Sequence, residues 1–142
     1  MVYRIAALMF AILGILPWQD AGAELPPPDG TWLVSQRVAF DIFPCKGALC
    51  GKISWLRNPA LRTRTMCGRT IVWGLTSAGP SQWNDGWFFD PENSETYRVS
   101  ARVETIDRIS ARIYRGIPLF GRTEILTRIQ ARSLPGWCEP PG

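Results

Sequence analysis

The sequence predicts an all-β fold: a small, closed, antiparallel up-and-down β-barrel of about eight strands, with little helix. Short stretches in which apolar and polar residues alternate recur over residues 31–129, and turn-forming residues separate them. The 13 glycines and 12 prolines make turns frequent, and no stretch repeats its apolar residues with the 3.6-residue period of a helix. Closure into a barrel would pair the two edge strands that an open sheet leaves exposed.

The expected strands follow one another between turn signals. They cover residues 31–35, 37–43, 49–56, 70–75, 83–90, 96–103, 108–114 and 122–129. Pro44 is expected to end the second strand, because proline cannot donate a hydrogen bond to a strand ladder. Asp85-Gly86 predicts a tight turn within the fifth segment. Residues 57–69 contain Asn58-Pro59 and four arginines, and they predict a polar excursion with a short helical turn.

Two consecutive segments, 96–103 and 108–114, alternate most regularly and predict a hairpin with arginines on its outer face. These arginines are Arg98, Arg102, Arg108 and Arg112. Because guanidinium groups make bidentate contacts with phosphate and carboxylate, the face is a candidate anion-binding surface. The alternative is a solvated outer face, since Glu104 and Asp107 lie at the same hairpin and the net charge of +4 is modest.

The first 23 residues predict a secretory signal peptide. Arg4 supplies a positive charge, residues 5–16 form an apolar run, and Ala21-Gly22-Ala23 fits the cleavage pattern of small residues. A retained membrane anchor is the alternative, but this run of 12 residues is shorter than the roughly 20 that span a bilayer. We therefore expect one mature domain at residues 24–142, periplasmic or secreted, with no membrane span after cleavage and no nucleic-acid partner.

The mature chain contains four cysteines, which are Cys45, Cys50, Cys67 and Cys138. An even number in an exported chain predicts two disulfides, for which three pairings exist. Cys45 and Cys50 bracket a short loop, so we pair them, which leaves Cys67 with Cys138. The second bridge would close a loop of about 70 residues and contribute roughly 4 kcal/mol in the chain-entropy model. A four-cysteine zinc site is the alternative, but the spacing lacks the paired knuckles of such sites.

The composition argues against an enzyme. The chain contains no histidine, which removes the commonest general base and every histidine-ligated metal site. Neither a serine–lysine motif nor a phosphate-binding loop is present. The acidic residues Asp85, Asp90, Glu92 and Glu95 fit turns better than they fit a catalytic carboxylate pair. We expect no catalytic residue, no metal and no cofactor.

Gly30-Thr31-Trp32 forms a G-x-W pattern at the start of the first strand. The pattern resembles the lipocalin and fatty-acid-binding superfamily, in which such a tryptophan closes the barrel floor beneath an arginine of the last strand. That resemblance implies that Arg128 stacks on Trp32, a structural contact that contributes roughly 1–2 kcal/mol when it is shielded from water. The alternative is a core tryptophan beside an unrelated surface arginine.

A wider pattern covers about residues 29–129. Its most specific parts are LCGKISWL at 49–56, a DP…TY turn at 90–97 and YRGIPLFGRT at 114–123. This pattern resembles the domain of unknown function 2147 family, small secreted bacterial proteins regarded as calycin-like β-barrels. Ser94 stands where the family typically has glycine, and Cys138 lies outside the common pattern. The resemblance implies a fold and a compartment, but it carries no known activity.

The aromatic content leaves two alternatives for the barrel interior. The mature chain has six tryptophans: Trp32, Trp55, Trp73, Trp83, Trp87 and Trp137. Aromatic side chains line many apolar pockets, but the side chains of a barrel of about eight strands can also fill it completely. We expect a binding module that holds an apolar or amphipathic small molecule in the barrel mouth. The alternative is a structural or interaction protein that docks its arginine-rich face on an anionic envelope component.

Overall fold

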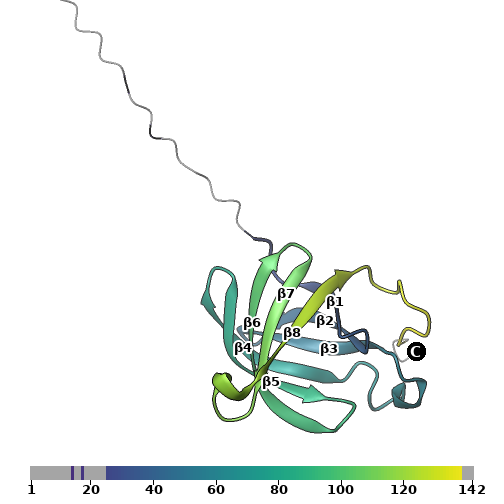
Figure 1. Cartoon of the computed structure of the whole chain (residues 1–142). Helices are drawn as coiled ribbons and strands as arrows, with labels where there is room; N and C mark the ends of the chain where they lie inside the picture. The colour runs from purple at the N-terminus through teal and green to yellow at the C-terminus, as the bar shows by residue number, and fades with distance from the viewer. Residues whose placement is uncertain (1–13, 15–16, 18–24, 139–142) are drawn as a thin grey trace, which may run out of the picture.

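The computed structural model describes residues 14, 17 and 25–138 of the 142-residue chain (Figure 1). The predicted signal peptide and its cleavage position lie outside these residues, apart from the isolated positions 14 and 17. Within the described part, no helix has the length and apolar character needed to cross a membrane.

Residues 25–138 form eight strands and two short 3-10 turns. The strands are β1 (Gly30–Val34), β2 (Val38–Cys45), β3 (Ala48–Leu56), β4 (Thr70–Gly79), β5 (Gln82–Asp90), β6 (Glu95–Thr105), β7 (Arg108–Tyr114) and β8 (Arg122–Ile129). The 3-10 turns are η1 (Pro59–Leu61) and η2 (Pro118–Phe120). Each strand pairs antiparallel with the next, and β1 also pairs with β8. The predicted closed up-and-down barrel is therefore confirmed, as is the short helical turn in residues 57–69.

Two local predictions were wrong. The second strand continues through Pro44, which pairs with Leu49 near the end of the β2–β3 hairpin, where a missing N–H interrupts little of the ladder. Asp85-Gly86 lies inside β5 as a bulge: Asp85 has a positive φ of 61°, and the register with β6 shifts between Trp83 and Gly86. A side chain at Gly86 would place its Cβ 2.5 Å from Leu75 Cγ, so close packing against β4 requires glycine there.

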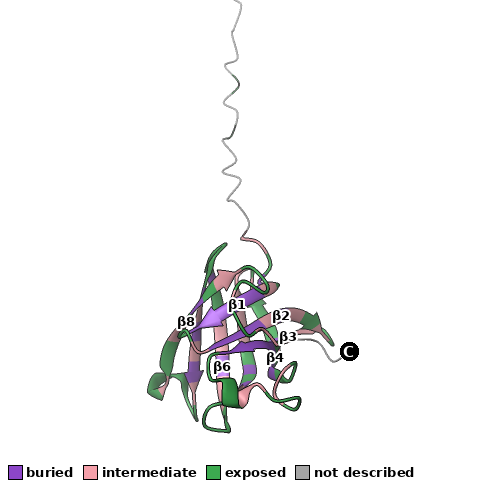
Figure 2. Cartoon of the chain, turned by 90° about the vertical axis from the view of Figure 1, so that its right-hand side faces the viewer, coloured by how far each residue is buried: buried purple, intermediate pink, exposed green. Residues whose placement is uncertain are grey.

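The core fills the barrel interior, and a second apolar cluster lies outside it. Figure 2 shows buried positions along the strands, with exposed positions between them and in the loops. The outer cluster joins Leu33, Ala39 and Trp55 to the C-terminal tail through Leu134 and Trp137. A hydrogen bond also holds the tail: the Trp55 indole N–H donates to the main-chain carbonyl of Pro135 at 2.9 Å.

The up-and-down topology gives the barrel two different ends. One end, which we call the mouth, carries the connections 35–37, 57–69, 91–94 and 115–121. The opposite end, which we call the floor, carries the turns 46–47, 80–81 and 106–107 and the entry to β1. In Figure 1 the 115–121 connection lies at the bottom left and the 57–69 connection at the lower right, whereas the β6–β7 turn lies at the top.

Candidate functional site

The floor is closed by an arginine stacked on a tryptophan. Trp32 and Arg128 are register partners on β1 and β8, and the guanidinium carbon lies 4.3 Å from the centroid of the indole ring. Trp32 is completely buried, and its indole N–H donates to the Pro28 carbonyl at 2.7 Å. Arg128 donates to the carbonyls of Asp29 and Ile106, each at 2.7 Å. The contact that the G-x-W pattern predicts thus joins both chain ends of the barrel to the β6–β7 turn.

Gly30 makes room for this arginine. It has a positive φ of 130°, which side-chain-bearing residues rarely adopt, and a Cβ there would lie 2.4 Å from Arg128 Nη1. The glycine of the G-x-W pattern is therefore required by the guanidinium that passes over it.

Above the floor, the interior holds a narrow apolar cavity of about 50 Å³. Its described lining is entirely apolar and consists of Val34, Phe40, Ile42, Val72, Leu75, Phe88, Val99, Ala101, Ile109, Ala111, Ile113 and Leu126. No tryptophan contributes to this described lining. Pockets for drug-sized ligands begin at roughly 300 Å³, so the side chains of the barrel fill most of its interior and leave only a slender space.

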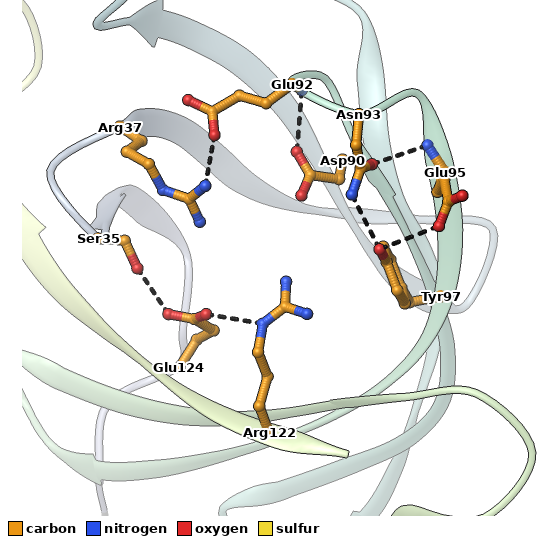
Figure 3. A network of polar contacts seen from close by, with 9 residues as sticks. All are labelled: Ser35, Arg37, Asp90, Glu92, Asn93, Glu95, Tyr97, Arg122 and Glu124. Atoms are coloured by element: carbon orange, nitrogen blue, oxygen red, sulfur yellow. Dashed lines mark hydrogen bonds and ion pairs between the residues drawn. The ribbon is translucent and has the colours of Figure 1, made fainter. Parts of the chain in front are cut away.

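Charged side chains cover the mouth above this cavity (Figure 3). Glu124 accepts hydrogen bonds from the Ser35 hydroxyl at 2.6 Å and from Arg122 Nε at 3.0 Å. Arg37 forms an ion pair with Glu92. The Arg122 guanidinium also interacts with Tyr97, and its carbon lies 5.4 Å from the centroid of the Tyr97 ring.

The Arg122–Glu124 pair keeps both of its charges. Burial opposes ionisation of Glu124, but hydrogen bonds from Ser35 and Arg122, together with the charges of Arg122 and Arg37, outweigh it and hold the pKa of this carboxyl below its usual value. The hydrogen bond to Glu124 raises the pKa of the Arg122 guanidinium above its usual value, despite partial desolvation. The mouth therefore presents a fixed guanidinium beside a fixed carboxylate.

The charged mouth adjoins the apolar interior. A small pocket of about 20 Å³ is lined by Arg37, Glu92, Arg122 and Glu124 together with Val34, Phe88 and Ile113. These three apolar residues also line the interior cavity. Polar groups at the mouth therefore lie next to a small apolar space inside the barrel.

Arg37 and Glu124 were not singled out from the sequence, whereas Glu92 was considered there and assigned to a turn. Arg122, Glu124, Leu126 and Arg128 share the inner face of β8, as the two-residue period of a strand requires. Because Arg128 was expected to point inward, the same alternation predicts that Arg122 and Glu124 also point inward. No local pattern indicates the partner Ser35, which lies 89 positions from Glu124 in the sequence.

Comparison with known proteins gives the family. The family model described as an uncharacterized protein conserved in bacteria (DUF2147) matches residues 30–128. The chain belongs to this family. A solved structure described as protein HP1028 from the human pathogen Helicobacter pylori, belonging to the lipocalin family, is similar with a TM-score of 0.58 and 13% sequence identity, covering 72% of this chain and 82% of that one. At such an identity the likeness shows the fold alone. No curated protein matches the sequence significantly.

The four outer-face arginines of this DUF2147 barrel lie on β6 and β7, and most of them have partners. Arg98 stacks on Trp87 at 4.1 Å and faces Asp85 at 3.6 Å. Arg102 contacts the Gln82 side chain at 3.3 Å. Arg112 hydrogen-bonds the η2 turn, and Arg108 lies at the start of β7. Anion binding by this face stays a prediction.

The remaining candidate residues take structural positions. Disulfides join Cys45 to Cys50 and Cys67 to Cys138, the pairing expected from the spacing. The second bridge ties the C-terminal tail to the 57–69 loop at the mouth. The Asp90 carboxylate accepts the Glu92 main-chain N–H at 2.9 Å, as an Asx turn does. Over the described residues, no group of three or more potential ligands is arranged to hold a metal ion.

Proposed function

We propose that this DUF2147 protein binds a single-chain amphipathic molecule, with its apolar chain inside the barrel and an acidic headgroup at the mouth. The observation that carries this proposal is that Val34, Phe88 and Ile113 line both the apolar cavity and a mouth pocket that contains Arg37 and Arg122. The lipocalin-like fold supports it, because barrels of this size can hold one small ligand.

The shape of the cavity limits the ligand. A volume of about 50 Å³ is too small for a fused-ring molecule, whereas a flexible alkyl chain can enter by modest shifts of the lining side chains. Ala101 and Ala111 line the cavity with the smallest side chains there. Each methylene of the chain that leaves water contributes about 0.8 kcal/mol, so a chain of moderate length provides enough free energy for binding.

Arg122 is the mouth group suited to contact an acidic headgroup. Arg122 donates from Nε to Glu124 and also interacts with Tyr97, and its guanidinium lines the pocket at the mouth. A planar guanidinium edge of this kind recognises a carboxylate or phosphate in bidentate fashion. The hydrogen bond from Arg122 Nε to Glu124 fixes the orientation of the guanidinium.

A fluorescence titration with cis-parinaric acid, a single-chain carboxylate, tests the proposal. The protein should give a saturable rise in emission, and Ala111→Leu, which fills the cavity, should weaken binding at least about tenfold. Ser100→Leu is the matched control, because Ser100 lines an outer hollow on β6. An absence of saturable binding, or equal losses in the two variants, would contradict an internal site. Circular dichroism establishes that both variants are folded.

A further inference from the structure

The connection between β7 and β8 carries an exposed apolar tip. Ile117, Leu119 and Phe120 are 52%, 74% and 78% exposed, and the latter two are the most exposed large apolar residues of the described chain. Single exposed apolar residues are ordinary on protein surfaces, but three within four positions at the end of one loop form a concentrated patch. We call these three residues the apolar tip.

The barrel holds the apolar tip in place from below. Arg112 donates from Nε to the Pro118 carbonyl at 2.9 Å and from Nη2 to the Leu119 carbonyl at 3.2 Å. Gly121 packs so closely against β7 that a Cβ there would lie 2.3 Å from the Ile113 carbonyl oxygen. Because the main chain is fixed on both sides, exposure of the tip is a property of the fold.

The charge of the protein is concentrated at the same end. The four mouth connections contain the arginines Arg37, Arg57, Arg62, Arg64, Arg69 and Arg115. Their acidic content is a single residue, Glu92, so these loops carry more positive charge than the whole chain, whose net charge is +4. The floor turns, by contrast, carry Lys46 and Asp107, which balance.

An apolar tip at the same end of the barrel as loops rich in arginine matches one kind of partner. Anionic phospholipid headgroups attract basic residues near a bilayer, and apolar side chains insert at the boundary between headgroups and acyl chains. We propose that the mouth of the barrel docks on an anionic membrane surface, with Leu119 and Phe120 inserted and the arginines of the mouth loops over the headgroups. The cavity entrance would then face the lipid.

Co-sedimentation with vesicles of phosphatidylglycerol in phosphatidylcholine tests this docking. The mature chain from Glu24 is used, with its start checked by intact mass, so that residues 1–23 contribute nothing. The protein should bind these vesicles, release at high salt and bind pure phosphatidylcholine much less. Leu119→Ser/Phe120→Ser and Arg57→Glu/Arg64→Glu should each weaken binding about tenfold or more.

Two control variants match these changes in chemistry but differ in position. Ile106→Ser removes an apolar residue that is 59% exposed at the floor, and Arg102→Glu/Arg108→Glu makes the same charge change on the side of the barrel. Both should bind within about twofold of the parent. Failure of the parent to bind would overturn the proposal. Losses as large in the controls as in the mouth variants would do the same.

One variant distinguishes membrane docking from ligand binding. Ala111→Leu changes the interior alone, so it should keep its vesicle binding even where it loses cis-parinaric acid. A loss of vesicle binding in this folded variant would mean that the bound lipid chain, and not the mouth surface, provides the attachment, and it would overturn docking by the tip.

Discussion

Replacing Trp32 with alanine removes an indole ring that is completely buried at the barrel floor. Truncation of a buried aromatic side chain costs about 3–5 kcal/mol in free energy of unfolding. We expect a value in the upper part of that range, because the substitution also leaves the Pro28 carbonyl without its indole donor at 2.7 Å.

Replacing Arg128 with alanine removes three contacts at once. The stack on Trp32 and the packing of the aliphatic stem contribute about 1–2 kcal/mol. The two hydrogen bonds to the carbonyls of Asp29 and Ile106 raise the expected cost to about 2–4 kcal/mol. Only the stack depends on Trp32, so the double variant should cost about 0.5–2 kcal/mol less than the sum of the two single changes.

Urea unfolding of the four proteins, with disulfides intact, measures this coupling. The pair Trp32→Ala and Arg102→Ala serves as the control cycle, because Arg102 is exposed on β6 and contacts Gln82 instead. This control should be additive within about 0.5 kcal/mol. Additivity in the Trp32–Arg128 cycle as well would refute the reasoning that the stack closes the floor.

Two other predictions concern the disulfides and the mouth. Peptide mapping without reductant should find the Cys45–Cys50 and Cys67–Cys138 bridges, and four free thiols in exported protein would contradict both. Removing the second bridge with Cys67→Ser/Cys138→Ser should lower the free energy of unfolding by up to about 4 kcal/mol. The lowered pKa of Glu124 means that its stabilising contribution is present above the usual value of 4.5 and disappears as pH falls through the folded-state pKa. At neutral pH, Glu124→Gln should therefore have a lower free energy of unfolding than the parent, and this free energy should fall less on acidification. Urea unfolding at several pH values measures both proteins, and parallel pH profiles would argue against this role of Glu124.

The architecture could be predicted because its signals are local. Residues 96–103 and 108–114 alternate with a period of two, and the structure pairs them as β6 and β7 with Val99 opposite Ile113. The error at Asp85-Gly86 has a physical reason. Both a tight turn and a bulge use a residue with positive φ, so the dipeptide alone does not distinguish them.

The site was predictable only where it follows from strand order. Trp32 and Arg128 meet because the first and last strands of a closed barrel are neighbours. The mouth depends instead on loops that approach one another across the barrel, as Arg37 and Glu92 do, and such contacts leave no mark on nearby sequence. The cavity depends on how the interior side chains pack, which composition does not determine.

Entry of a single chain into the barrel from the mouth can be observed by methyl-resolved NMR. The protein is labelled at isoleucine, leucine and valine methyl groups and titrated with dodecanoate. We expect the methyl signals of the cavity-lining Val34, Val99, Ile113 and Leu126 to shift, while those of the outward-facing Ile125 and Ile106 stay unchanged. Interior methyl signals that stay fixed at saturating dodecanoate, or shifts confined to Ile125 and Ile106, would contradict it.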